Sequence, residues 1–351
     1  MRYRAALAFL ATFLSCAAMA HGDEVAELEQ LLQRLAAYLD EGEATQALQA
    51  QRELCRRYVR LDQEQRNTFA QRLGDALYDA APGMRVVAGR TLALRPDQVD
   101  VERLLAAMAT EPRADVQQAL TGALGAAFSR LPADAAAETR VAAASTLEQL
   151  IRNDTTSPNS RRAMLMGLGN VGAEALPALY SLCDDPRWSS VLHWSLPAAL
   201  AATGDANAVD KLILLFEADQ AVGFRVGCTQ AMGALLRRAD SASQTSVQPA
   251  VDLLRGLVLS SAADATTKAA AAQAYAMWPA APQDVEFVSA VCQQVEQSTG
   301  QLCKNYLRAL VYLNVELNTE TRSFVETIAA SDQTEPGCRK VALALLDGQD
   351  G

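Results

Sequence analysis

Three glycines in the middle of the chain have the spacing of a nucleotide-binding turn. Gly167, Gly169 and Gly172 form the pattern G-x-G-x-x-G within "RRAMLMGLGNVGAEALPALYSLCDDP", residues 161–186. In a dinucleotide-binding fold this pattern follows a β-strand and opens a helix, so that the backbone can approach a pyrophosphate. The preceding letters "RRAMLM" lack β-branched residues and follow a helical spacing. We therefore interpret the glycines as helix-packing and helix-ending positions, with a nucleotide site as the minor alternative.

Histidine could supply a general base or a metal ligand, but the chain has only two, His21 and His193. A terminal His21 could chelate copper through its amine and ring, but such a site needs a second histidine nearby. His193 occupies a repeated position that otherwise carries mostly Arg or Lys, which favours a structural role over that of a base or ligand. The motifs H-E-x-x-H, G-x-S-x-G and the P-loop are absent. We predict a protein that is not an enzyme, with no cofactor and no metal site.

Cysteine is the remaining reactive side chain, with seven copies, none of them in a C-x-x-C pair. This spacing gives no support to thioredoxin-type chemistry or to paired-cysteine zinc sites. Cys16 lies in the leading segment, which leaves an even number for disulfides in an oxidising compartment. The favoured bridge joins Cys292 to Cys303 across "QQVEQSTGQL", and the alternative is that most of these cysteines are small buried residues.

The first twenty residues have the three parts of an export signal. "MRYR" is basic, "AALAFLATFLSCAAM" is apolar, and Ala18-Met19-Ala20 is a small-residue cleavage site. We expect cleavage after Ala20 and an exported protein, periplasmic or secreted, whose mature chain begins at His21. Anchoring as a lipoprotein through Cys16 is the less favoured alternative. No later segment is apolar enough to predict a membrane span.

The composition favours helices and disfavours nucleic acid. Of the 351 residues, half are hydrophobic but only 5% are aromatic, and Ala and Leu dominate. These residues lose little conformational freedom in a helix. The formal net charge of −10 argues against a general nucleic-acid binder, since such binding requires neutralisation of phosphates. We therefore expect a protein partner and no nucleic acid.

From about residue 84 the chain repeats one helical frame, in steps of 32, 44, 32, 32, 43, 36 and 36 residues. We number each copy from a basic or polar position zero. Position zero falls at Arg85, Gln117, Arg161, His193, Arg225, Lys268, Lys304 and Lys340. Positions +3 and +7 are mostly apolar and position +8 is mostly small, and these spacings lie on one face of a helix.

A second apolar helix, such as "AVDKLILLFEA", lies between successive copies, so each unit is predicted to be a helical hairpin of about 35 residues. One hairpin cannot bury its apolar face alone, whereas stacked hairpins share a continuous core. We predict an all-α solenoid of about seven or eight stacked antiparallel hairpins over residues 80–348, preceded by a helical N-terminal cap over 21–79.

The repeat resembles HEAT repeats, including the bacterial type called lyase-like HEAT repeats. The resemblance rests on the 32-residue steps, the proline of "EALPAL", and a turn Asp six residues before a basic residue, as in Asp79–Arg85 and Asp219–Arg225. It implies that these Asp and Arg side chains form a ladder along the stack, and it covers roughly residues 80–351. It implies a fold and says little about function.

Solenoids bind partners along an extended surface, which the second helices usually line. Positions +1 and +5 point away from the apolar stripe, and Trp and Arg are frequent in interface hot spots. The predicted partner-binding face consists of Arg162, Met166, Trp194, Gln230, Gln273 and Asn305. The alternative for Trp194 is partial burial beside Trp188 and Pro197. We expect a non-catalytic scaffold or adaptor; the alternatives are a lyase-like accessory protein or chaperone that holds a prosthetic group or client, and a structural component of a cell-envelope complex.

Overall fold

The structure is a computed structural model, and it describes residues 24–131, 137–240, 243–332 and 334–348. The predicted signal segment 1–20, Cys16 and the predicted mature terminus at His21 lie outside these residues. All regular structure in the described ranges is helical, which confirms the predicted all-α class. Within these ranges no helix is both long and apolar enough to cross a membrane.

The chain divides into two compact units, one up to Ala178 and the other from Leu179. The first unit begins with a helix over residues 24–40. It continues with α2 (Ala44–Tyr58), α3 (Gln63–Ala76), α4 (Pro82–Leu92), α5 (Gln98–Thr110), α6 (Ala114–Phe128), α7 (Ala137–Arg152), α8 (Pro158–Val171) and η1 (Ala173–Ala175). The division falls inside α9 (Leu176–Asp184).

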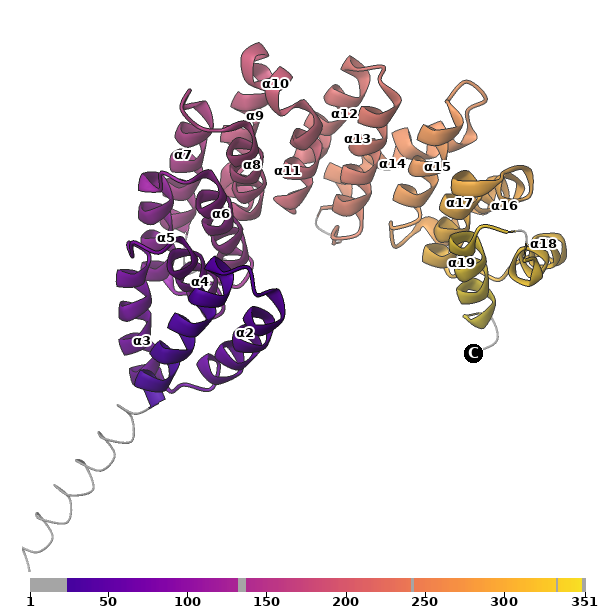
Figure 1. Cartoon of the computed structure of the whole chain (residues 1–351). Coiled ribbons are helices and arrows are strands. Elements are labelled where there is room, and N and C mark those ends of the chain that lie inside the picture. The colour runs from indigo at the N-terminus through magenta and orange to yellow at the C-terminus, as the bar shows by residue number, and fades with distance from the viewer. Residues whose placement is uncertain (1–23, 132–136, 241–242, 333, 349–351) are drawn as a thin grey trace, which may run out of the picture. The chain divides into compact units, whose positions relative to one another are not determined.

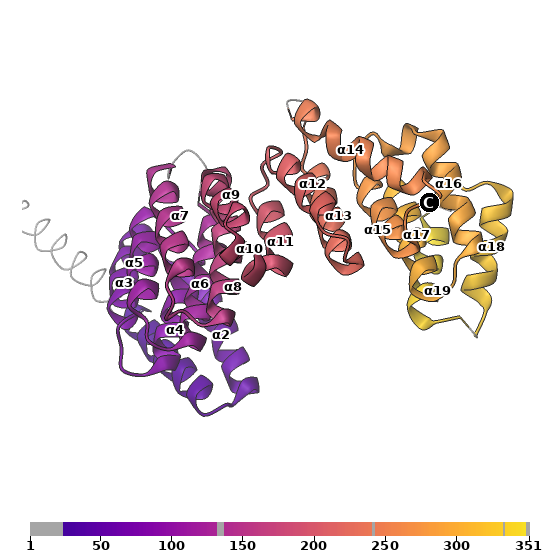
Figure 2. The same cartoon turned by 90° about the horizontal axis from the view of Figure 1, so that it is seen from above.

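The second unit is built in the same way. Its elements are α10 (Pro186–Leu192), η2 (His193–Ser195), α11 (Leu196–Ala202), α12 (Ala208–Ala218), α13 (Val222–Leu236), α14 (Gln244–Leu259), α15 (Ala265–Tyr275), η3 (Ala281–Gln283), α16 (Val285–Gln297), α17 (Gly300–Leu313), α18 (Thr319–Ala330) and α19 (Pro336–Asp347). Figures 1 and 2 show these helices as successive hairpins.

The helices of each unit pack in two rows. In the first unit α4, α6 and α8 contact one another in succession, and α5 contacts α7. In the second unit the same holds for α11, α13, α15, α17 and α19, and for α12, α14, α16 and α18. Each helix also contacts its hairpin partner, as α12 does α13. This pattern is that of an all-α helical-repeat solenoid and confirms the predicted fold class.

Local sequence fixes where many helices begin. Asp62 and Asp97 form capping boxes: each carboxylate accepts a backbone N–H from three residues ahead, and the backbone N–H of each Asp donates in return to the side-chain oxygen of that third residue. Ser157, Asp264 and Asn318 cap their helices in the same forward direction. The hairpins are thus delimited by the polar residues that punctuate the repeats.

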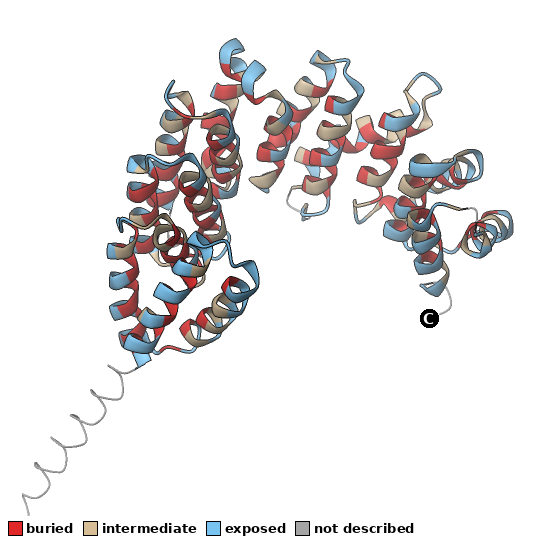
Figure 3. Cartoon of the chain, viewed as in Figure 1, coloured by how far each residue is buried: buried red, intermediate tan, exposed pale blue. Residues whose placement is uncertain are grey.

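The apolar stripe predicted from the repeat forms the core, and Figure 3 shows buried residues along the packed sides of the helices. Position +3 is fully buried in the first seven copies of the repeat, from Ala88 to Leu307. The last two copies depart from the frame, because Val311 and Leu343 are exposed while Leu310 and Ala342, one position earlier, are buried. The stripe has shifted by one residue in α19, whereas in α17 position +3 stays buried and only position +7 has become exposed.

The glycines of the opening pattern have structural roles. Gly167 lies in α8, where a Cβ would come within 2.7 Å of the Thr121 side chain on α6. Gly172 ends α8 with φ 110° and ψ −155°, and Gly204, at the same repeat position, has φ 70°. Positive φ favours glycine, which explains both helix ends. No strand precedes Gly167 in the described chain, as a dinucleotide turn would require.

Candidate functional site

The second unit contains a groove between α11 and α13 with a volume of about 430 Å³. Its floor consists of small side chains from both helices, and three larger polar or aromatic residues stand along it. The lining residues are Trp194, Pro197, Ala198, Ala201, Ala202, Gly227, Gln230, Ala231, Ala234 and Arg238. Two residues of the predicted partner-binding face, Trp194 and Gln230, therefore lie in one groove.

Trp194 stands at one end of this groove with 65% of its surface exposed. Its ring edge faces Phe224 in a T-shaped contact at 6.0 Å, and the ring passes within 3.4 Å of where Gly223 would carry a Cβ. The alternative of partial burial beside Trp188 and Pro197 does not describe this side chain: Pro197 lines the same groove, but most of the Trp194 surface is exposed. Trp194 thus presents an aromatic face to solvent from a fixed support.

His193 helps to hold Trp194 in place. Its ring stacks on the buried Phe224 at 3.8 Å, and its Nε2 donates a hydrogen bond to Asp219 at 2.8 Å. It also meets Trp194 edge-on. Stacking and hydrogen bonding fix the position of the imidazole and occupy Nε2, which supports the predicted structural role.

Arg238 stands at the other end of the groove, one residue beyond the C-cap of α13. Its side chain is exposed, and Nη1 donates a hydrogen bond to the carbonyl oxygen of Ala201 at the end of α11. Arg130 makes the equivalent bond to Ala93 in the first unit, across the same separation of 37 residues. The sequence analysis missed this recurring arginine, which its constant spacing could have revealed.

The other predicted face residues are distributed along further second helices. Arg162 and Met166 lie on α8 in the first unit, where Arg162 is exposed and Met166 is half-buried. Gln273 on α15 and Asn305 on α17 are half-buried in the second unit, and Asn305 accepts a hydrogen bond from Gln301. None of these four lines the groove between α11 and α13.

Two of the position-zero residues bond to the turn before their own helix. Arg85 donates to the carbonyl oxygen of Asp79, and Arg161 to that of Asn153. Arg225 lies over the ring of Phe216 at 4.2 Å. Lys268 and Lys304, also position-zero residues, are half-buried on α15 and α17.

The acidic partners of position zero differ from those that the family resemblance implied. Arg85 forms a two-pronged ion pair with Glu111 of the next hairpin, at 2.7 and 2.9 Å, and His193 bonds Asp219 of the next hairpin. The Asp79 carboxylate accepts instead a backbone N–H within its own turn. These two pairs have the same separation of 26 residues, a regularity already present in the sequence, whereas Lys304 pairs with Glu335 of the next hairpin at 3.8 Å and a separation of 31 residues.

The predicted Cys292–Cys303 bridge is not formed in this structure. Both cysteines are free and buried, Cys292 on α16 and Cys303 on α17. Burial raises the pKa of Cys303 to about 11. The structure agrees with the alternative that these cysteines are small buried residues.

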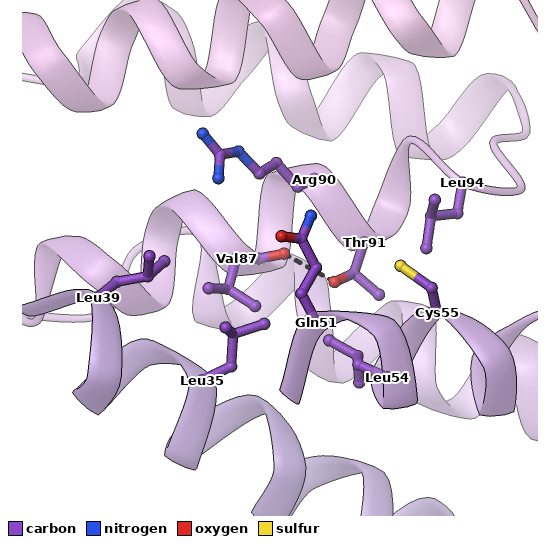
Figure 4. A pocket seen from close by; sticks show the side chains of 9 residues that line it. All are labelled: Leu35, Leu39, Gln51, Leu54, Cys55, Val87, Arg90, Thr91 and Leu94. Atoms are coloured by element: carbon purple, nitrogen blue, oxygen red, sulfur yellow. Dashed lines mark hydrogen bonds between the residues drawn. The ribbon is translucent and has the colours of Figure 1, made fainter. Parts of the chain in front are cut away.

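A pocket in the first unit lies among the helix at 24–40, α2 and α4 (Figure 4). Leu35, Leu39 and Leu54 provide much of its apolar lining, while Cys55 lies to one side and Arg90 at its polar edge. Its volume of about 30 Å³ is far below the volume of about 430 Å³ of the groove between α11 and α13. It therefore has no room for a prosthetic group.

A buried polar cluster joins α3 to α5 in the first unit. Asp100 is 1% exposed, and its carboxylate lies 3.3 Å from Arg103 and 3.8 Å from Arg66. Burial, and then the charge of Asp97, raise the pKa of Asp100 to about 6 despite the two arginines. The cluster links the capping box of α5 to its neighbouring helix α3.

Among the described residues, no group of three or more His, Cys, Asp or Glu side chains is arranged to hold a metal ion.

Comparisons with known proteins add the following. No protein-family model matches the chain, and no curated protein matches it. Among solved structures, the chain is similar to the complex of CpcE and CpcF of phycocyanin lyase from Nostoc sp. PCC7120, with 16% identity, a TM-score of 0.41, and coverage of 80% of this chain and 93% of that chain. It is also similar to Kap121p bound to Nup53p, with 12% identity, a TM-score of 0.44, and coverage of 92% of this chain but only 45% of Kap121p. Likenesses this distant carry no inference about function.

Proposed function

We propose that this protein is an exported, non-catalytic scaffold that binds another protein through its helical repeats. The observation that carries the proposal is the groove between α11 and α13, with Trp194 65% exposed at one end. A large aromatic side chain held in place loses little entropy when it is covered, so it is well suited to anchor a partner. The repeat fold supplies the rigid frame that positions this anchor.

Export is supported by the basic, apolar and small-residue segments before His21. N-terminal sequencing of the protein recovered from its native host tests this part. We expect the mature chain to begin at His21. An unprocessed chain that begins at Met1, recovered inside the cell, would contradict export.

Photo-crosslinking in the native host tests the scaffold itself. A photoreactive phenylalanine analogue replaces Trp194, and a matched control carries the same analogue at Val285, which is 80% exposed on α16 outside the groove. We expect one recurrent protein to be crosslinked from position 194 and not from position 285. Equal, scattered crosslinking from both positions would overturn the proposal.

A further inference from the structure

We propose that the groove between α11 and α13 binds an amphipathic α-helix of the partner, with a large apolar residue against Trp194 and an Asp or Glu against Arg238. This inference rests on the proposed scaffold function and specifies the partner's chemistry. Three features of the groove support it: the chemistry of its floor, its length and its charge.

The floor favours a helix over an extended segment. Six of the ten lining residues are Ala or Gly, and they lie on two helices whose backbone groups bond within the helices. An extended segment would place its own N–H and C=O groups over this apolar floor without partners, whereas a helix satisfies them internally. Small side chains also let the backbone of a docked helix approach closely. At Gly227 an added Cβ would meet nothing within 4 Å, so the floor is open to a partner's side chain there.

The length of the groove sets the length of the helix. Trp194 lies against Gly223 at the start of α13, and Arg238 follows Gly223 by fifteen positions. At about 1.5 Å per residue these positions are roughly 22 Å apart along the helix axis. A partner helix of about four turns spans this distance, with its apolar anchor and its acid near opposite ends.

The charge of the groove selects the acid. None of the ten lining residues is acidic, and the one charged residue among them is Arg238. Its exposed guanidinium has five N–H donors, of which the bond to Ala201 uses one. Arginine binds carboxylates through paired N–H groups, so an Asp or Glu of the partner fits this end. This basic end stands out in a chain with a net charge of −10.

Synthetic peptides and the full-length protein test the inference. The first probe is a fluorescein-labelled helix-forming peptide of about 16 residues, with Phe near one end, Leu every third or fourth position and Glu four turns from the Phe. The second has the same sequence with two central prolines, which prevent a helix. The third carries Lys in place of the Glu. Fluorescence anisotropy gives each Kd.

We expect the helical Glu peptide to bind about tenfold more tightly than the proline peptide. Gly227→Leu fills the groove and should weaken binding about tenfold, whereas Gly256→Leu, at an equally open site on α14, should not. Arg238→Glu should reverse the preference from the Glu to the Lys peptide, while the adjacent Arg237→Glu should leave it unchanged. Circular dichroism confirms that each variant is folded.

Equal affinity for the helical and proline peptides, including no binding of either at millimolar concentration, would overturn the inference. So would Glu and Lys peptides that respond alike to Arg238→Glu. The crosslinking from position 194 separates this failure from that of the scaffold function. A recurrent partner together with no discrimination among the peptides rejects the helix and retains the scaffold, whereas the absence of a recurrent partner rejects both.

Discussion

Replacing Gly233 by alanine tests how closely neighbouring repeats pack. Gly233 occupies position +8 on α13 and faces α15. A Cβ on this residue would lie 2.7 Å from both Cα and Cβ of Ala274 and 3.2 Å from its carbonyl oxygen. Carbon atoms in contact are normally about 3.5–4.0 Å apart. Because the obstructing atoms include backbone, α15 must move by close to an ångström.

The expected change in the free energy of unfolding is the sum of two opposing terms. Overpacking a core typically costs about 1–3 kcal/mol. Alanine is favoured over glycine inside a helix by about 1 kcal/mol. Gly227→Ala, on the same helix, gains the second term without the first, because its Cβ would meet nothing within 4 Å. We therefore expect Gly233→Ala to be less stable than Gly227→Ala by about 1–3 kcal/mol, since helix propensity cancels between the variants.

Urea unfolding followed by tryptophan fluorescence measures the difference. The three tryptophans, Trp188, Trp194 and Trp278, all lie in the second unit, so the signal reports the unit that carries both substitutions. Similar m-values for the two variants would show that the midpoints compare free energies of unfolding. If Gly233→Ala is as stable as Gly227→Ala, or more so, the close approach of α13 and α15 is refuted.

Two further predictions concern charged groups. The raised pKa of Asp100, about 6, means that its contribution to stability is complete below the unfolded-state pKa near 3.8 and is lost as the pH rises through 6. Between pH 3.5 and 7 the free energy of unfolding of the wild type should therefore fall by about 3 kcal/mol relative to that of Asp100→Asn, as measured by hydrogen exchange in α5. A wild-type advantage that stays constant or grows as the pH rises contradicts this. The Asp115 carboxylate has a lowered pKa, so the comparison with Asp115→Asn should show the opposite sign. Arg255→Met should lower the free energy of unfolding of the second unit in urea by about 1.5–3 kcal/mol, because it leaves the half-buried Asp284 without its 2.6 Å ion pair. Arg339→Met removes an exposed pair and should lower it by less than about 1 kcal/mol. Equal losses for the two variants would refute the distinction between buried and exposed pairs.

The sequence predicted the fold because each repeat carries the same apolar spacing, and burial of residues such as Leu120 and Leu200 follows from it. The repeat spacing did not predict which residues are buried in α17 and α19, and the reason is physical. Leu310 and Val311 are adjacent and both apolar, so a period of 3.6 residues does not decide which of them turns inward. Packing against the preceding hairpin decides it, and this depends on loop geometry that the spacing does not encode.

The candidate site was predictable only in part. Trp194 and Gln230 follow from their repeat positions, but these positions do not say that the two residues line one groove. The disulfide prediction was not confirmed: the ten residues between Cys292 and Cys303 place them on different helices, and residue spacing alone does not give the orientation of either thiol. The regular separations of 26 and 37 residues were the stronger signals, since they mark contacts between hairpins.

Two glycines of α13 explain why a groove lies on one side of this helix and a tight contact on the other. Gly227 and Gly233 are six residues apart, so at about 100° per residue they lie on different faces of the helix. Gly233 meets the backbone of α15, while Gly227 opens toward α11, where no atom lies within 4 Å of its added Cβ. On one face the missing side chain lets the repeats stack closely, and on the other it leaves room for a partner. Substitution of Gly233 should therefore lower stability without acting on the groove, and Gly227→Leu should block the groove without lowering stability, so the two variants separate the roles of one helix in folding and in binding.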